Sequence, residues 1–384
     1  MSDKTNIPKL RFKDKDGNNY PKWMPKRLGD IGKIAMNKRI YKNETSEYGE
    51  IPFYKIGNFG KEADTFITRK KFNEYKEKYP YPKKGDILIS ASGSIGKTLE
   101  YDGEEAYYQD SNIVWLEHDE QVINKFLKYF YAIVKWNGVE GTTIKRLYNK
   151  NILSTKINLP IVEEQEKIGH FFSKLDRQIE LEEEKLELLE QQKKGYMQKI
   201  FSQQLKFKDE NGQYYIIWEA EKLGELTNIT TGSLDANAMV PNGKYKFFTC
   251  ARETYEIDTY AFDTEALLIS GNGANVGYIH YYQGKFNAYQ RTYVLNNFKA
   301  NITYLKYYLE KYLLRRIYSE KRDGNTPYIT RSTLYDMEIM IPSLEEQEKI
   351  GNFFNKIDNL IELQVDKIEV LKQRKKGLLQ KMFV

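Results

Sequence analysis

Apolar side chains recur at helical spacing in two long stretches of the chain, 159–201 and 341–383. In the first stretch Phe172, Ile179, Leu186 and Ile200 are separated by multiples of seven residues, and Ile168, Leu175, Leu189 and Tyr196 form the neighbouring stripe. The second stretch repeats the pattern with Phe354, Ile361, Ile368, Met382, Ile350, Ile357, Leu371 and Leu378. Such stripes predict two helices that each pack against another helix.

These two stretches are copies of one another. They match without a gap at an offset of 182, and 25 of 43 positions are identical. A shorter match, at an offset of 195, relates 10–30 to 205–225. Between these anchors the copies diverge, apart from islands such as LISASGSIG (88–96) and LISGNGANVG (268–277). The chain therefore contains two copies of one arrangement of elements, in which the anchor segments are shared and the sequences between them differ.

Each predicted helix has a marked start, with Pro160 or Pro342 just before it and a pair of glutamates in its first turn. About 40 residues make a rod of roughly 60 Å. We expect the two helices to pair antiparallel and to relate the halves by an approximate two-fold axis, because each helix follows its own module. The seam is predicted at Phe172, Leu175, Ile179, Leu186, Leu189, Phe354, Ile357, Ile361, Ile368 and Leu371. Four polar residues interrupt it, and they either fix its register or face solvent: Glu182, Lys193, Gln364 and Lys375.

The stretches between the helices predict mixed modules. Strand-like runs such as IPFYKIG (51–57) and DILIS (86–90) precede a helical stretch near 123–134, and KYKFFTC (244–250) precedes a helical stretch at 302–318. Strands first and a helix later indicate an α+β fold. We therefore predict two α+β domains, at 1–158 and 204–340, separated by long helices at 159–203 and 341–384 that form an antiparallel coiled coil.

Composition narrows the function classes. The chain has 384 residues, of which 40% are hydrophobic and 30% charged, so a soluble protein of two domains is expected. No run approaches the roughly 20 apolar residues of a membrane span, and we expect a cytoplasmic protein without a membrane partner. One cysteine and three scattered histidines offer no disulfide framework and no cluster with metal-ligand spacing.

The net charge of +6 is unevenly distributed, since 24–158 carries +5 and 204–340 carries 0. Cations that can neutralise phosphates and side chains that can bond base edges are candidates for contacts with DNA. In the first half the candidates are Lys38, Arg39, Arg69, Lys70, Ser92, Ser94, Lys97, Thr142, Thr143, Lys145 and Arg146. In the second half they are Arg252, Asn272, Asn275, Arg291, Asn325, Tyr328 and Arg331. The alternative for any one basic cluster is that it serves solubility.

The segment ASGSIGKT (91–98) nearly matches a phosphate-binding loop, G-x-x-x-x-G-K-[ST], and lacks only its first glycine. The equivalent loop at 271–278 keeps glycines and loses the Lys-Thr pair. We therefore interpret both as glycine-hinged turns that present polar side chains. NTP binding that depends on Lys97 remains the alternative.

A module, an E-E-Q-E-K-I-G-x-F-F helix, a second module and a second such helix together resemble the Type I restriction-modification specificity subunits over essentially the whole chain. The resemblance implies two target recognition domains that read a bipartite, asymmetric site in double-stranded DNA. It also implies two modification subunits, which methylate adenine N6 with S-adenosylmethionine, and two restriction subunits, which use ATP and Mg²⁺.

The chain itself is expected to be non-catalytic and to hold no cofactor, because it has no amino-methyltransferase, helicase or nuclease motif that we can identify. The exposed faces at 163–167 and 345–349 are the candidates for docking modification subunits; a solvated helix face is the alternative. The second hypothesis for the whole chain is a coiled-coil scaffold or an RNA-binding protein, and salt-sensitive binding without duplex sequence preference would favour it.

Overall fold

The computed structural model describes residues 7–136, 146–215, 217–320 and 326–383. The chain divides into two compact units: unit 1 comprises Met1–Glu182 and Lys367–Val384, and unit 2 comprises Glu183–Asp366. Two long helices, α4 (Val162–Phe201) and α8 (Leu344–Met382), cross this division, so each unit contains one half of each helix. Both helices lie within the ranges that the repeat indicated.

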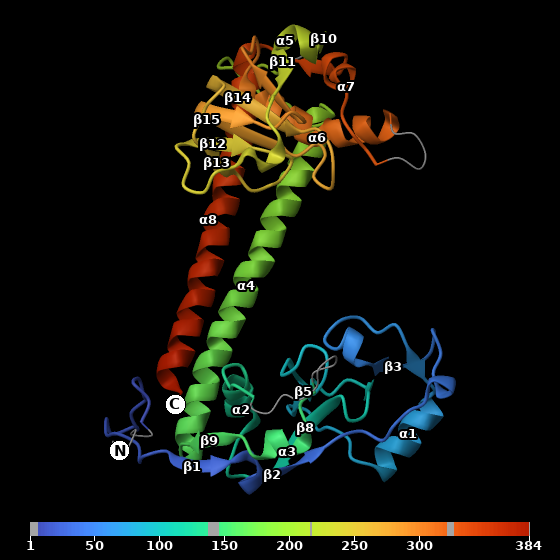
Figure 1. Ribbon diagram of the computed structural model, residues 1–384, viewed down its shortest axis with the longest axis vertical. Helices are drawn as coiled ribbons and strands as arrows, with labels where there is room; N and C mark the ends of the chain where they lie inside the picture. Colours follow the sequence, from blue (N-terminus) through green and yellow to red (C-terminus); the bar gives the residue numbers. More distant parts are fainter. Residues whose placement is uncertain (1–6, 137–145, 216, 321–325, 384) are drawn as a thin grey trace. The chain divides into compact units, whose positions relative to one another are not determined.

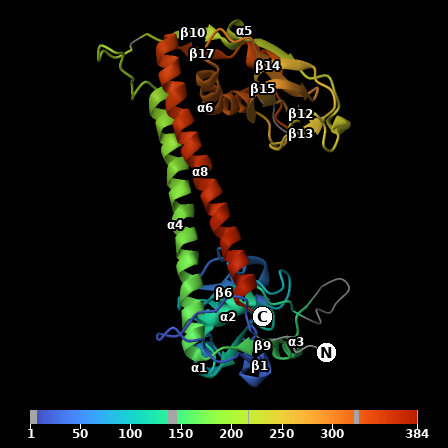
Figure 2. The ribbon, with the colours of Figure 1, turned by 90° about the vertical axis from the view of Figure 1, so that its left-hand side faces the viewer.

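Helices α4 and α8 lie side by side in both views (Figure 1, Figure 2). In unit 1 Asp176 of α4 bonds Lys375 of α8, and Glu182 bonds Lys367 at 2.5 Å. As numbers rise along α4 they fall along α8, so the predicted antiparallel pairing is confirmed. The seam residues Phe172, Ile179, Phe354 and Ile368 are buried, as are Leu175, Ile357 and Leu371; Leu186, Leu189 and Ile361 are half-buried.

Equivalent ion pairs join the two long helices in each unit. In unit 2 the Lys193 ammonium lies 2.7 Å from Asp358, which also accepts a 2.6 Å hydrogen bond from the Tyr307 hydroxyl. In unit 1 Lys375 bonds Asp176, which accepts a 2.8 Å bond from the Tyr129 hydroxyl. The alternative that Lys193 and Lys375 merely face solvent is wrong, because each is tied across the seam.

The E-E-Q-E-K segment begins each long helix and ties together chain segments of its own unit. The carboxylate of Glu164, which is fully buried, accepts bonds from Arg11 at 2.6 Å and from the Trp23 indole at 3.0 Å. The Gln165 side chain bonds the Pro160 carbonyl and the Ile123 amide. In unit 2 Glu346 accepts from Trp218, and Gln347 bonds the Pro342 carbonyl and the Asn301 amide.

The prediction that 163–167 and 345–349 are exposed docking faces is therefore wrong for Glu164, Gln165, Glu346 and Gln347, which are buried. Their polar groups serve the fold, since buried polar groups need partners. A nearby glycine has a related role: a Cβ at Gly169 would lie 2.8 Å from the Lys125 Cβ. Close packing of α4 on the helix that carries Lys125 requires a glycine there.

Unit 2 contains a six-stranded sheet in the order β11-β16-β14-β15-β12-β13. All neighbours are antiparallel except β12 and β15, which are parallel. The strands are β11 (Asn228–Thr231), β12 (Tyr245–Phe248), β13 (Tyr255–Ile257), β14 (Phe262–Ser270), β15 (Ile279–Ala288) and β16 (Thr292–Asn296). The helices are α5 (Leu223–Leu226), α6 (Ile302–Glu320) and α7 (Arg331–Tyr335), and β10 (Glu219–Lys222) pairs with β17 (Glu338–Ile341).

Unit 1 splits the same plan into two sheets, β2-β8-β5-β6 and β4-β3-β7. The strands are β2 (Gly32–Ala35), β3 (Ile51–Tyr54), β4 (Phe66–Ile67), β5 (Ile87–Ser90), β6 (Thr98–Glu100), β7 (Tyr107–Tyr108) and β8 (Ile113–His118). The helices are α1 (Arg69–Lys78), α2 (Asn124–Tyr131) and α3 (Asn149–Leu153), and β1 (Met24–Arg27) pairs with β9 (Lys156–Leu159).

The two units share their strand pairings. The antiparallel pairs β2·β8, β5·β8 and β5·β6 correspond to β11·β16, β14·β16 and β14·β15, and the parallel pair β3·β7 corresponds to β12·β15. One difference is that β15 is continuous, where unit 1 has two short strands, β6 and β7. The predicted α+β class with an internal repeat is confirmed.

Each unit closes its core with the far end of a long helix. In unit 1 Phe383, just after α8, is 6% exposed and stacks on Phe126 at 5.2 Å between ring centroids. In unit 2 Phe201, the last residue of α4, stacks on Phe354 at 5.9 Å. The core of unit 1 therefore combines residues from both ends of the sequence.

Candidate nucleic-acid interface

A glycine-containing loop follows the central strand in each unit, β5 in unit 1 and β14 in unit 2. In unit 1 the loop closes with Ser90 N–H donating to the Lys97 carbonyl at 2.8 Å. In unit 2 Ser270 N–H donates to the Tyr278 carbonyl at 2.9 Å. Gly96 and Gly277 have φ of +79° and +80°, a conformation that favours glycine. The predicted glycine-hinged turn therefore has the same closure in both units.

Two other chain segments bond the start of each loop. In unit 1 Ala91 N–H donates to the Asn112 carbonyl at 2.8 Å, and its carbonyl accepts from Leu147 N–H at 2.8 Å. In unit 2 Gly271 N–H donates to the Arg291 carbonyl at 2.9 Å, and its carbonyl accepts from Ile329 N–H at 2.8 Å. Antiparallel bridges follow between Ser92 and Arg146, and between Asn272 and Tyr328. Each unit thus brings three separate segments to one place, in the same way.

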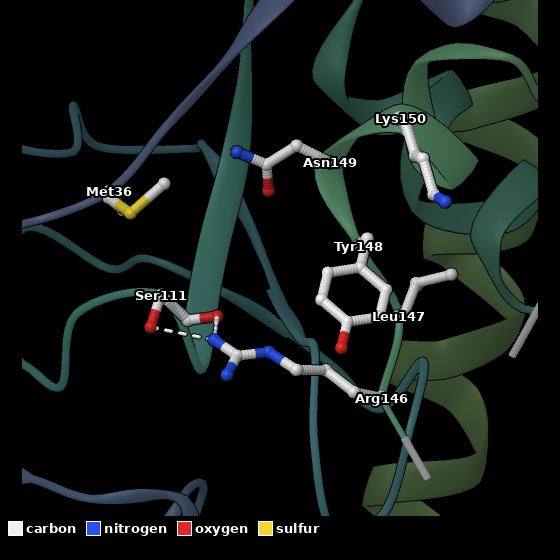
Figure 3. Close-up of a pocket in the computed structure, with 7 residues that line it drawn as sticks. All are labelled: Met36, Ser111, Arg146, Leu147, Tyr148, Asn149 and Lys150. Atoms are coloured by element: carbon white, nitrogen blue, oxygen red, sulfur yellow. Dashed lines mark hydrogen bonds between the residues drawn. The ribbon is translucent and has the colours of Figure 1, made fainter. Parts of the chain in front are cut away.

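Side chains in the unit 1 cluster hold one another in position (Figure 3). The Arg146 guanidinium donates to the Ser111 carbonyl at 3.1 Å and to its hydroxyl at 2.7 Å. The Ser92 hydroxyl donates to the Asn112 amide oxygen at 2.9 Å. Arg146 lines a pocket of about 510 Å³ with Tyr148, whose ring lies 5.8 Å from the guanidinium. The other lining residues are Met36, Ser111, Leu147, Asn149 and Lys150.

The unit 2 cluster is centred on Cys250 and Arg291. The Cys250 thiol lies 3.4 Å from the Arg291 carbonyl, and the Asn275 amide donates to the Cys250 carbonyl at 3.1 Å. The Arg252 guanidinium lies 5.4 Å from the Tyr278 ring centroid, a cation–π contact. Arg291 is exposed. This unit therefore gathers five of the residues predicted for its half: Arg252, Asn272, Asn275, Arg291 and Tyr328.

His280 contacts both Tyr278 and the segment that carries Arg252, and it helps to fix this arrangement. The His280 ring packs edge-on against Tyr278, with ring centroids 4.8 Å apart, and its Nε2 lies 3.0 Å from the Ala251 carbonyl. Burial lowers the pKa of His280 below its usual value. A neutral imidazole donates its single N–H to that carbonyl, so His280 holds the segment that carries Arg252 without adding charge.

Four other predicted residues of unit 1 lie outside this cluster, two of them near Ser111 and the α1 helix and two on α1 itself. Lys38 lies 5.2 Å from the Tyr79 ring centroid, and Arg39 is 3.7 Å from the carboxylate of Asp110, which precedes Ser111 in sequence. On α1, Arg69 pairs with Glu105 at 2.6 Å and with Glu50 at 3.5 Å, while Lys70 is exposed. The hydrogen bond with Glu105 raises the pKa of Arg69.

Seven predicted residues remain. Three of them are exposed: Ser94, Lys97 and Arg331. Ser94 lies on the unit 1 loop, where its carbonyl accepts from the Ser90 hydroxyl, and Arg331 begins α7. Thr142, Thr143, Lys145 and Asn325 lie outside the residues that the structure describes.

The resemblance to a phosphate-binding loop does not hold. Strand β6 begins at Thr98, directly after Lys97, whereas a loop of that type leads into a helix. The Lys97 ammonium donates to the Phe59 carbonyl at 2.6 Å. The structure therefore gives no support to NTP binding at Lys97.

Sequence reasoning did not single out Asn112. It occupies the position in unit 1 that Arg291 occupies in unit 2, since each carbonyl accepts the N–H at the start of its loop. An alignment anchored on the strands β8 and β16, which follow these two residues, would have found the equivalence. The two loops differ in length, so an alignment of the loops alone does not reveal that Asn112 and Arg291 are equivalent.

Two further findings concern the described parts of the chain. Within 7–136, 146–215, 217–320 and 326–383, no group of three or more histidine, cysteine, aspartate or glutamate side chains is placed to hold a metal ion. Over the same residues, none of the helices combines the length and the apolar composition of a membrane span.

A model of the Type I restriction modification DNA specificity domain matches the chain twice, at residues 20–191 and 216–373. The two matches together cover well over half of the sequence and coincide with the two copies of the internal repeat. Each match contains one of the loop clusters and the start of one long helix.

The chain is similar to known specificity subunits. It is 56% identical, over 150 residues, to a putative type I restriction enzyme specificity subunit from Haemophilus influenzae, and this match spans 39% of the chain and 39% of that relative. It is 25% identical to the MjaVIII specificity subunit of Methanocaldococcus jannaschii, over 96% of the chain and 94% of the relative. The crystal structure of a Type I S subunit from M. genitalium has the same fold, with a TM-score of 0.63, 17% identity, and coverage of 98% and 99% of the two chains.

Proposed function

The chain belongs to the Type I restriction modification DNA specificity family, and we propose that it reads a bipartite, asymmetric DNA site, one half with each unit. The observation that carries this proposal is the pair of loop clusters. Each is built on the same backbone bonds, yet Ser92 and Arg146 in unit 1 stand where Asn272 and Tyr328 stand in unit 2. Two related readers with different side chains suit two unequal half-sites, whereas a homodimer would require a palindrome.

Cations near the clusters supply the sequence-independent part of binding. Lys38, Arg39 and Lys97 in unit 1, and Arg252 and Arg331 in unit 2, can neutralise phosphates. Polar side chains of the clusters then reach base edges. The recognition domains are proposed at 1–158 and 204–340, and all of the DNA-contact residues predicted from the sequence remain proposals. Those on α1, Arg69 and Lys70, have the weakest support because Arg69 is held by two glutamates.

Catalysis is assigned to partner subunits. We propose that two modification subunits methylate adenine N6 with S-adenosylmethionine, and that two restriction subunits use ATP and Mg²⁺. The name "specificity subunit", carried by the relatives, supports an assembly in which this chain is the non-catalytic part. The docking surface proposed for the modification subunits retains the exposed residues of the motif, Glu163, Glu166, Glu345 and Glu348.

The test is to co-express the chain with a Type I modification subunit in a bacterial host that lacks DNA methylation and to map N6-methyladenine across the genome. We expect a two-part motif with a fixed gap that appears only when this chain is present. A matched chimaeric chain, in which another such module replaces 226–340, should change one half of the motif and leave the other intact. A stable complex that produces no motif would contradict the proposal and favour a scaffold or an RNA-binding protein.

A further inference from the structure

Three positions in each cluster keep the same place in the backbone while their side chains differ. The first follows the start of the loop and is Ser92 in unit 1 and Asn272 in unit 2. The second precedes the strand beside the loop and is Asn112 or Arg291; the third bridges the first and is Arg146 or Tyr328. The strands that hold these positions are alike, since Ser90 pairs with Ile113 and Ser270 with Thr292 in equivalent registers.

From this arrangement we propose that the three positions read the bases. In unit 1 Asn112 and Arg146 contact one half-site while Ser92, which is buried, orients Asn112, and in unit 2 Asn272, Arg291 and Tyr328 contact the other half-site. The inference rests on the proposed function and goes beyond it by assigning sequence preference to particular positions. A residue that contacts only phosphate carries no sequence information and has no need to differ between two equivalent readers. Positions on one shared backbone with different polar side chains are where unequal half-sites can be distinguished.

The chemistry of these side chains fits base edges. Asparagine can bond adenine through its N6 and N7, arginine can bond guanine through its O6 and N7, and serine can bond any of several groups. Asn112 has a defined orientation because its amide oxygen accepts from Ser92, and this leaves the amide nitrogen available as a donor. Its side chain is half-buried and is therefore held by the fold before DNA binds.

Ser92 is 9% exposed, whereas Arg146 and the unit 2 residues are accessible. Arg146 uses one terminal nitrogen for both of its bonds to Ser111 and is half-buried at the edge of its pocket. Arg291 is exposed, and Tyr328 has 60% of its surface exposed. A side chain that is accessible and has no acidic partner in the described structure can exchange its bound water for a base.

The experiment maps N6-methyladenine motifs for four variants co-expressed with the same modification subunit: Asn112→Ala, Asn112→Asp, Arg291→Ala and Arg291→Lys. We expect Asn112→Ala to relax one base position in one half-site. The preference for the cognate base over other bases at that position should fall by about 5- to 150-fold, the discrimination that one base contact supplies. Arg291→Ala should relax one position in the other half-site only.

The conservative variants separate base reading from two simpler explanations. Asn112→Asp keeps the acceptor for Ser92 and loses the donor, so it should fold normally and shift the preferred base. Arg291→Lys keeps the charge and loses the planar fork. If Arg291 contacts phosphate alone, Arg291→Lys will methylate as the unaltered chain does, and Arg291→Ala will lower methylation equally at all sites with the motif still strict; that result for Arg291→Ala overturns the proposal for this position.

Matched controls are Asn73→Ala on α1 and Arg374→Ala on α8, two exposed positions outside the clusters; both should leave the motif unchanged. Co-purification of each variant with the modification subunit shows that it is folded. If the unaltered chain gives a two-part motif and all four variants keep it strict, the assignment of these positions is wrong while the proposed function stands. If the unaltered chain gives no motif, the proposed function itself fails.

Discussion

Replacing Phe383 by alanine should destabilise unit 1, although most of that unit lies more than 200 residues earlier in the sequence. The Phe383 ring is 6% exposed and contacts three aromatic rings, with centroid distances of 5.2 Å to Phe126, 6.2 Å to Trp23 and 6.3 Å to Phe172. Removal of a buried phenylalanine costs about 3 to 5 kcal/mol. For a unit of this size that corresponds to a lower melting temperature by about 6 to 20 °C.

The assay has to report each unit separately, because one melting temperature for two units is not well defined. Amide hydrogen exchange followed by mass spectrometry gives a free energy of opening for the peptides of each unit. Peptides of α2, β5 and β8 should exchange faster in Phe383→Ala, while those of β14 and β16 should not change.

Two control variants define the outcome. Phe201→Ala removes the equivalent ring of unit 2 and should give the opposite pattern, with loss of protection in β14 and β16. Val370→Ala removes an exposed side chain of α8 and should change stability by no more than about 0.5 kcal/mol. If Phe383→Ala costs less than about 1 kcal/mol, or weakens both units equally, the assignment of Phe383 to the core of unit 1 is refuted.

Three further predictions concern the helix contacts. Asp358→Asn should lower the stability of unit 2 at neutral pH by about 1 to 2 kcal/mol, less than a fully buried pair would give because the carboxylate is partly exposed; urea unfolding followed by exchange measures this. Burial alone would raise the pKa of Asp358, but the bonds from Lys193 and Tyr307 outweigh it and the pKa is lowered. The stabilisation is therefore present above the unfolded pKa of about 3.9 and is lost as the pH falls through the folded value, so acid titration should show this loss in the unaltered chain and not in Asp358→Asn. Gly169→Val should disrupt packing of α4 on α2, since even a Cβ would come within 2.8 Å of the Lys125 Cβ, and hydrogen exchange in the peptides of unit 1 should show a loss of about 1 to 3 kcal/mol; unchanged exchange would contradict this. Glu164→Leu should cost about 3 to 5 kcal/mol because it leaves Arg11 and the Trp23 indole without their acceptor, and a neutral result in the same measurement would show that water replaces the carboxylate.

The long helices and the duplication could be predicted from the sequence because both are encoded locally. A stripe such as Phe172, Leu175 and Ile179 specifies a helix and its buried face without reference to distant residues. The ungapped match between the copies then assigns the same structure to 341–383. Their antiparallel pairing followed from the order of modules and helices along the chain.

The loop clusters could not be predicted in the same way. Ala91 bonds Asn112 and Leu147, which lie 21 and 56 residues later, and no local pattern encodes such pairings. The role of Glu164 was missed for a similar reason: an acidic residue in the first turn of a helix is explained by the helix dipole, and only the fold brings Trp23 to it. For Asn112, the register of a strand rather than its own sequence context reveals the position.

The composite core of unit 1 also has a consequence in time. A ribosome that has just produced the first half of α4 must add about 200 more residues before Phe383 leaves the exit tunnel, which takes about 10 to 40 s at typical elongation rates. During this interval Trp23, Phe126 and Phe172 lack the aromatic ring that covers them. The residues of unit 1 that are made before α4 therefore wait for Phe383 before their core is complete.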